Sequence, residues 1–392
     1  MIEAPTAGTA PEIPAGNTRA AWNASLHLSV WAYVMYGIGY ATPYLRTDLR
    51  LTDFQSGLYA SAMAIGILTA GVSADWVGRR IGPSLLQDVA VGEIAAGILL
   101  VIGAPAFAVS LAGTLIFGLG GGTLGVQVVV QLARVARGDS RMLMGQANAV
   151  SMIAAAAAPV VMGLAASGLH AWRLALLLPI AAFAVLAVLR PREKFTRSLA
   201  RIPRQSLPRA YWFVWLLLSL SVAIEFSVVF WGSTIVGRAT GVSSGDATLL
   251  ASLFVAGMFL GRAAIWRGLG AQRSPLLLMS VGLSIVLVGV AMVWLSTVAA
   301  VSGLGLFLCG LGTSGLYPIG IAVALAVAPR APLEASARAT LAAGLSVLLA
   351  PSILGLLADM VGVVAAWPII MVLAVAALAL LAVTPRPPRT AS

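Results

Sequence analysis

The sequence carries the stretch Gly71-Val72-Ser73-Ala74-Asp75-Trp76-Val77-Gly78-Arg79-Arg80-Ile81-Gly82 between two apolar segments that are each long enough to cross a bilayer. Its glycines allow sharp turns and close helix packing. Asp75 and the Arg79–Arg80 pair add fixed charges of both signs at a membrane surface. A short basic turn after a membrane helix would share a few of these residues, whereas this stretch has the whole pattern G-x-x-x-D-x-x-G-R-R-x-G.

The composition independently indicates a membrane protein. Hydrophobic residues make up 60% of the chain and charged residues 9%, with a mean hydropathy of +0.99, which is too few charges to cover a soluble protein of this length. Cys309 is the single cysteine, so the chain has no internal disulfide framework. With His27 and His170 as the only histidines, we expect no metal site and no cofactor. Residues 1–21 have no signal-peptide pattern and are predicted to be a disordered tail.

The chain contains twelve apolar stretches that could each form a membrane-spanning helix. A span needs about 20 residues, and a range of about 17–25 is usual. The stretches are 22–45, 53–74, 83–102, 107–133, 144–167, 174–189, 211–236, 247–266, 275–296, 299–328, 339–360 and 364–384. The sequence therefore predicts an all-α integral membrane protein.

The basic residues that give the net charge of +11 are distributed as this topology requires. With twelve spans and a cytoplasmic N-terminus, all but four of the 24 lysines and arginines fall on one side, the exceptions being Arg46, Arg50, Arg173 and Arg238. The positive-inside rule then places both termini in the cytoplasm. We therefore expect a multi-pass protein of the cell (plasma or inner) membrane whose basic residues face the cytoplasm and bind no nucleic acid.

The two halves of the chain resemble each other at a nearly constant offset. Three pairs of segments repeat after 191 or 192 residues: Gly113-x4-Gly118-Leu119-Gly120 as Gly305-x4-Gly310-Leu311-Gly312, Ala158-Pro159-x3-Gly163-Leu164 as Ala350-Pro351-x3-Gly355-Leu356, and Ala60-Ser61 with Gly66 as Ala251-Ser252 with Gly257. Small residues let membrane helices pack closely, and Pro159 and Pro351 are expected to bend their helices. The sequence predicts a six-plus-six parallel repeat.

The loop motif and the repeat together resemble the major facilitator superfamily of secondary transporters. The resemblance implies twelve transmembrane helices in two pseudo-symmetric six-helix bundles, which rock around a central cavity. The predicted parts are an N-terminal bundle (22–189), a basic cytoplasmic linker (190–210), a C-terminal bundle (211–384) and a cytoplasmic tail (385–392).

The resemblance also implies a gating role for the motif residues Gly71, Asp75, Gly78, Arg79 and Arg80. In the outward-open state Asp75 would accept hydrogen bonds from the N-terminal end of the eleventh span, where the helix dipole favours an anion. Arg79 would reach an acid at the inner end of the fourth span. This sequence departs from the family there, because that end offers Gln127, Gln131 and Arg134 instead of a carboxylate.

Glu225 is the leading candidate for proton coupling, because it lies some 14 residues into the seventh span and charges inside a membrane are costly and usually functional. The resemblance places this helix along the cavity, where a carboxyl group could bind and release a proton as the cavity changes sides. The alternative is a structural Glu225 that bonds a neighbouring helix. Glu93 is a second candidate at similar depth, but it and Asp88 lie in the third span, which the resemblance places outside the cavity. We expect no special role for Asp359 near an outer helix end.

Polar residues at helical spacing predict the lining of the same cavity. Tyr33 and Tyr36 share a stripe of the first span, and we expect cavity positions for Gln127 in the fourth span and for Thr313 and Tyr317 in the tenth. Tyr40 and Tyr44 lie closer to a span end, where an aromatic belt is the simpler interpretation.

The predicted lining contains no deep lysine or arginine, which favours a neutral or cationic organic solute over an anionic one. We predict a proton-coupled secondary transporter, with export ahead of uptake. A solute:proton symporter, an uncoupled facilitator and a non-transporting receptor of the same fold are the alternatives. The expected partners are the small-molecule substrate, protons and the lipid bilayer, and we expect a monomer. No nucleophile–base pair or nucleotide-binding motif indicates an enzyme.

Overall fold

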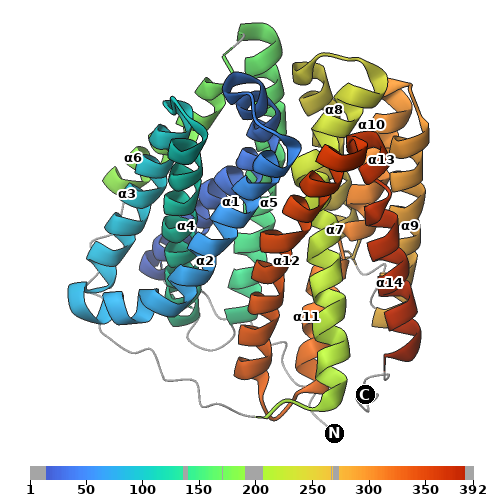
Figure 1. The fold of residues 1–392 in the computed structure, drawn as a ribbon. Helices are drawn as coiled ribbons and strands as arrows, with labels where there is room; N and C mark the ends of the chain where they lie inside the picture. Colours follow the sequence, from blue (N-terminus) through green and yellow to red (C-terminus); the bar gives the residue numbers. More distant parts are fainter. Residues whose placement is uncertain are drawn as a thin grey trace, which may run out of the picture.

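The computed structural model describes residues 15–135, 140–169, 171–189, 206–265, 267 and 273–384. Residues 1–14 of the predicted N-terminal tail, residues 190–205 of the predicted linker and the tail 385–392 lie outside the described residues. The described chain is helical nearly throughout (Figure 1). The helices are α1 (Ala15–Leu49), α2 (Asp53–Ile81), α3 (Pro83–Ile102), α4 (Phe107–Val135), α5 (Ser140–Leu169), α6 (Arg173–Val188), α7 (Arg209–Thr240), α8 (Ser244–Ala264), α9 (Pro275–Leu295), α10 (Ala299–Thr313), α11 (Leu316–Val327), α12 (Pro332–Val361), α13 (Val363–Ala366) and α14 (Ile369–Val383).

These helices account for the twelve predicted spans. Ten helical segments are long and apolar enough to cross a membrane, with α10 and α11 together forming the tenth span and α13 and α14 the twelfth. The remaining two spans are α6, which is apolar but has 16 residues, and α1, which has 35 residues and carries several tyrosines and serines. The prediction of an all-α membrane fold is confirmed.

Two helix starts differ from the prediction. Helix α1 begins at Ala15, so the disordered tail predicted for 1–21 is wrong for residues 15–21. Alanine is the strongest helix former, and the segment around Ala20, Ala21 and Ala24 favours continuation of the helix beyond the apolar span. Likewise α7 begins at Arg209, two residues before the predicted boundary at 211.

The tenth span is broken between α10 and α11. The break falls at Ser314 and Gly315, and Pro318 follows one turn later. Proline has no backbone N–H, so the carbonyl of Ser314 lacks the donor that a continuous helix would provide four residues on. This carbonyl is therefore open to a donor from another helix.

Glycines allow the same helix contacts in both halves. In the first half, Gly66 lies against the backbone of Leu115 and Leu119, and Gly118 against that of Met63. The corresponding contacts in the second half join Gly257 to Phe307 and Leu311, and Gly310 to Phe254. A side chain at any of these glycines would collide with backbone atoms, so the repeat seen in the sequence marks matching helix crossings.

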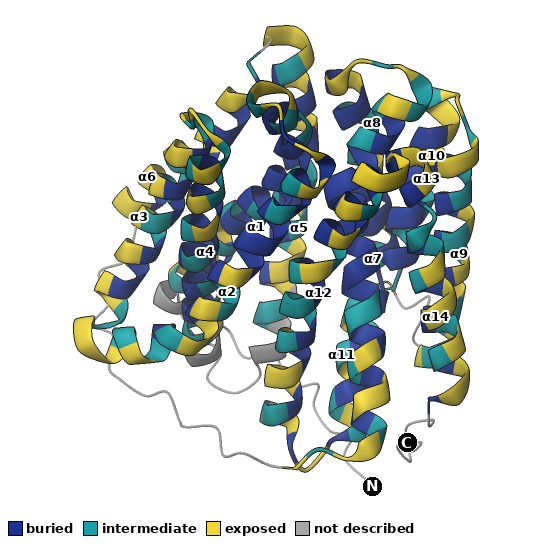
Figure 2. Ribbon diagram, in the orientation of Figure 1, coloured by how far each residue is buried: buried dark blue, intermediate teal, exposed yellow. Residues whose placement is uncertain are grey.

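The two halves form separate bundles that meet along α1 and α7, α2 and α12, and α5 and α8 (Figure 1). We call the end of the molecule that holds the Gly71–Gly82 stretch the inner side, following the charge distribution of the sequence, and the opposite end, at the top of Figure 1, the outer side. Figure 2 shows α7 as one of the most buried helices, with an unbroken buried segment from Ser221 to Ser233. The centre of α7 therefore belongs to the interface between the bundles.

Candidate substrate and coupling site

A hydrogen bond between Tyr36 of α1 and Glu225 of α7 joins the two bundles at their centre. The Tyr36 hydroxyl donates to Oε1 of Glu225 over 2.5 Å, and both side chains are buried. One turn toward the outer side, Gly39 packs so tightly on α7 that an added Cβ would lie 2.8 Å from Cγ1 of Val229. A hydroxyl–carboxylate bond this short is typical of the stronger, charge-assisted kind.

Two further tyrosines surround Glu225. Tyr40 and Tyr317 each interact electrostatically with its carboxyl group. Tyr40 is fully buried, and its hydroxyl has no hydrogen-bond partner among the described residues, so the interpretation of Tyr40 as an aromatic-belt residue is wrong. Tyr317 is half-buried. We call Tyr36, Tyr40, Glu225 and Tyr317 the central cluster.

Three residues predicted to line the cavity make their polar contacts elsewhere. The Tyr33 hydroxyl donates to the carbonyl of Ala175 in α6 (3.0 Å), inside its own bundle. Tyr33 and Tyr36 are three positions apart, which turns them by about 60° around the helix and directs them to different neighbours. Gln127 donates to the carbonyl of Pro83 at the start of α3 (3.4 Å). Thr313 donates to carbonyls of its own helix α10.

Arg262, near the end of α8, lies close to the central cluster. Its Nε donates to the Ser314 carbonyl (3.2 Å), which the break between α10 and α11 leaves without a helical donor. The half-buried guanidinium is within electrostatic reach of the Tyr36 hydroxyl. The sequence has no lysine or arginine deep in a span, but the side chain of Arg262 extends from near the end of α8 toward Tyr36. Hydropathy locates the Cα of a residue, whereas a long side chain carries its charge several ångströms away.

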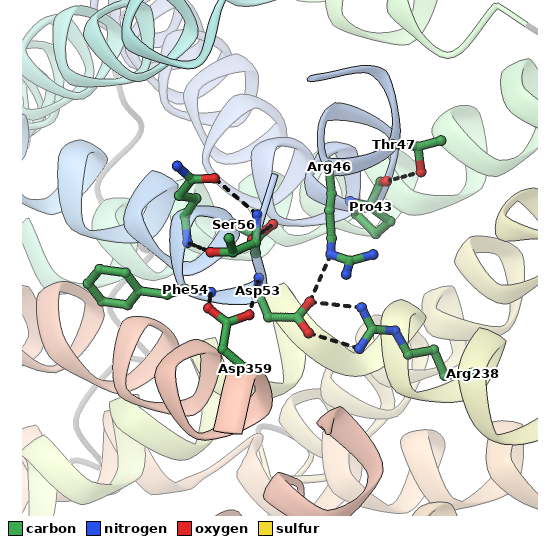
Figure 3. Close-up of polar contacts among 10 residues, drawn as sticks. Pro43, Arg46, Thr47, Asp53, Phe54, Ser56, Arg238 and Asp359 are labelled. Carbon is green, nitrogen blue, oxygen red and sulfur yellow. Dashed lines mark hydrogen bonds and ion pairs between the residues drawn. The ribbon is translucent and has the colours of Figure 1, made fainter. Parts of the chain in front are cut away.

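On the outer side, a network of ion pairs and hydrogen bonds joins the two bundles (Figure 3). Asp53, the first residue of α2, is buried and forms a bidentate ion pair with Arg238 of α7 (2.8 and 2.9 Å). Arg46 of α1 approaches the same carboxylate at 2.8 Å. The carboxylate of Asp359, near the end of α12, accepts the backbone N–H groups of Asp53 (2.7 Å) and Phe54 (2.9 Å).

We call this arrangement the outer-closed state and the contact between Asp359 and α2 the outer latch. Sequence reasoning missed it, although Thr52 and Gln55 form a capping box, and the pattern Thr-x-x-Gln marks a helix N-terminus that attracts anions. The matching contact between α5 and α8 is uncharged. There Gly245 at the start of α8 lies against Ser167, with no room for a side chain.

The Gly71–Gly82 stretch is helical as far as Ile81, so most of it is the end of α2 rather than a loop. Gly82 makes the turn to α3 with a φ of 84°, a conformation that favours glycine. Asp75 pairs with Arg79 one turn away at 2.5 Å, and Arg80 stacks over the Trp76 ring. The interactions predicted for Asp75 in the outward-open state stay predictions, because this structure is outer-closed.

The other predicted residues lie as follows. Glu93 is half-buried and packs against Gly120 of α4, away from the central cluster. Pro159 and Pro351 both lie inside continuous helices, α5 and α12. The carbonyl of Pro351 accepts a hydrogen bond from the indole of Trp231 (3.0 Å), which joins α12 to α7.

No known family model matches the sequence, and no curated protein does. The structure resembles that of a bacterial homologue of the human lysosomal transporter Spinster in an inward-facing, unoccupied conformation, at 15% identity and a TM-score of 0.75, over 95% of this chain and 97% of that one. It also resembles the nucleoside transporter NupG (15%, TM-score 0.71, 94% and 99%) and a D-xylose-proton symporter (15%, 0.72, 96% and 99%).

The helices and these similarities define an all-helical, multi-pass membrane protein that shares the fold of these transporters. The fold is the one predicted from the resemblance to the major facilitator superfamily, with two pseudo-symmetric bundles of six spans. Identities of 15% establish the fold, and the chemistry must be argued from the site itself.

Proposed function

We propose that this protein is a secondary transporter that moves a small, neutral or cationic organic solute by alternating access, coupled to protons through Glu225. The hydrogen bond between Tyr36 and Glu225 is the observation that carries the proposal, because it connects the candidate proton carrier to the contact between the two bundles. The proton-linked activities of two kinds of structurally similar protein, a D-xylose-proton symporter and proton-dependent oligopeptide transporters, support a proton-linked mechanism for this chain.

The chemistry of Glu225 gives a physical reason for coupling. An ionised carboxylate accepts a charge-assisted hydrogen bond, which is roughly twice as strong as a neutral one. Protonation of Glu225 removes that charge and weakens its bond to Tyr36 across the interface. We infer that proton binding loosens the centre of the outer-closed state, and that proton release restores the contact.

We propose that the protein lies in the cell membrane as a monomer with both termini in the cytoplasm, in agreement with the distribution of its lysines and arginines. Export is our first proposal for the direction of transport, and uptake by solute:proton symport is the alternative. An uncoupled facilitator would not need Glu225, and a receptor of the same fold would give no flux.

Purified protein in proteoliposomes tests this function. Glu225→Gln should abolish solute flux driven by a pH gradient while leaving solute exchange partly intact. Glu93→Gln is the matched control, since Glu93 is the other carboxyl group at mid-depth and lies away from the central cluster. Gradient-driven flux that survives Glu225→Gln would refute the coupling role, and the sign of the flux relative to the gradient distinguishes export from uptake.

A further inference from the structure

Most hydrogen-bond donors of the Arg262 guanidinium have no acceptor among the described residues. A guanidinium has five N–H donors, and in Arg262 only Nε has an acceptor among the described residues, the carbonyl of Ser314. No carboxylate forms an ion pair with Arg262 in the described part of the chain. A half-buried charge that forms no ion pair with a described carboxylate is costly, so this position favours an anionic ligand.

The direction of the helices brings Arg262 toward Glu225. Side chains lean toward the N-terminus of their own helix. Helix α8 starts at the outer side and α7 at the inner side, so Arg262 leans outward and Glu225 leans inward. The end of α7 (Thr240) and the start of α8 (Ser244) both lie at the outer side. Glu225 is 15 residues from the end of α7, and Arg262 is 18 residues from the start of α8. At the helical rise of 1.5 Å per residue, their Cα atoms therefore differ in depth by only about 5 Å.

Tyr36 connects the two charges. Its hydroxyl donates to Oε1 of Glu225 and lies within electrostatic reach of Arg262. The second oxygen of Glu225, Oε2, accepts no hydrogen bond from a described residue. Among the described residues, the central cluster therefore has one carboxylate oxygen without a donor and, within reach of Tyr36, guanidinium N–H groups without an acceptor. This pattern is complementary to a ligand with charges of both signs.

We propose that Arg262 binds a carboxylate group of the transported solute while Glu225 faces its basic group, so that the substrate is a zwitterion such as an amino acid. This inference rests on the proposed transport function and narrows its substrate class. A zwitterion has no net charge, which agrees with a neutral solute. The planar guanidinium suits a carboxylate because two parallel N–H groups can meet its two oxygens.

Binding to full-length protein in nanodiscs, measured as ligand-induced thermal stabilisation without a proton gradient, tests the proposal. The probes are matched series on the alanine, leucine and phenylalanine skeletons, each comprising the amino acid, its amide, the deaminated acid and the deaminated amide. Wild-type protein should bind an amino acid in preference to the other members of its series. In Arg262→Gln, the ratio of the affinity for an amino acid to the affinity for its amide should fall by roughly ten- to a hundred-fold relative to wild type. This is the loss expected for a charge-assisted contact.

Arg262→Gln keeps an N–H donor for the Ser314 carbonyl, so a merely structural role of Arg262 would leave the ligand preference unchanged. Arg338→Gln is the matched control, because Arg338 is exposed on α12 and already pairs with Glu334 (2.8 Å). The proposal is overturned if Arg262→Gln keeps the wild-type preference, or if no acid-bearing compound binds wild type. The binding assay uses no proton gradient, so its result does not depend on whether Glu225→Gln abolishes gradient-driven flux in liposomes. The two proposals can therefore fail separately.

Discussion

The outer latch makes a quantitative prediction for Asp359→Asn. The carboxylate of Asp359 accepts two backbone N–H groups at the N-terminus of α2, at 2.7 and 2.9 Å, across the bundle interface. Asparagine is nearly isosteric but neutral, and its side chain has a single acceptor oxygen. When the bundles separate on the outer side, water replaces these contacts. The substitution should therefore destabilise the outer-closed state and leave the outward-open state unchanged.

The size of this effect follows from the two contacts. A charge at an exposed helix N-terminus contributes up to about 1 kcal/mol, and one hydrogen bond about 1 kcal/mol. Because Asp359 is exposed and solvent screens its charge, we expect a total of about 1–2 kcal/mol. That free energy corresponds to a roughly 5- to 30-fold change in the ratio of the two states.

Distance measurements between spin labels can report this ratio. Labels at Leu169 of α5 and Val361 of α12, both exposed at the outer side, would span the two bundles in a Cys309→Ala background. Asp359→Asn should increase the long-distance population. Asp48→Asn is the control, since Asp48 pairs with Arg173 inside one bundle (2.6 Å). Equal distance distributions in Asp359→Asn and wild type would refute the latch, as would the same shift in both variants.

Three further predictions concern the bundle interface. Asp75→Asn should shift the same label pair toward the outer-closed state, and an unchanged distribution would contradict the inner latch expected for Asp75. Tyr36→Phe removes the hydroxyl that bonds Glu225 and should lower proton-driven flux about tenfold or more, with a flatter pH profile; wild-type flux and pH profile would contradict this role. Gly57→Ala would place a Cβ 2.6 Å from the Pro351 carbonyl oxygen and should disfavour the outer-closed state by about 1–3 kcal/mol in the distance assay. Gly92→Ala meets no atom within 4 Å and should be neutral, so equal effects of the two glycine variants would refute this packing argument.

Features with a strong local signal could be predicted from the sequence. The spans follow from the length of the apolar runs, and the repeat from glycines that are needed where backbones touch, as at Gly118 and Gly310. Glu225 was identified because a carboxyl group at that depth is costly, and Tyr36 because it shares a stripe of helix α1 with other polar residues. The structure brings these two residues into contact.

Features that depend on side-chain direction or on contacts between distant segments could not be predicted. Helical periodicity does not resolve the 60° that separates Tyr33 from Tyr36, so both were expected to face the cavity. The backbone of Arg262 lies near the end of α8, and its guanidinium is positioned by a hydrogen bond to the Ser314 carbonyl at the break in the tenth span. Hydropathy does not reveal this contact between two helices. Asp359 contacts Asp53, which is 306 positions away in the sequence, and no local pattern predicts such a contact.

The outer latch has a consequence for how strongly solute is captured from each side of the membrane. A site that faces a given side for only a fraction of the time has an apparent Kd on that side equal to its intrinsic Kd divided by that fraction. If Asp359 favours the outer-closed state as predicted, the proposed transporter should bind solute from the inner side with a Kd close to the intrinsic value and solute from the outer side with a higher apparent Kd. The corresponding α5–α8 contact has the uncharged Ser167, so the charged contacts that would set this difference between the two sides of the membrane, those of Asp359 and of Asp53 with Arg238, all lie at the start of α2, far from the central cluster.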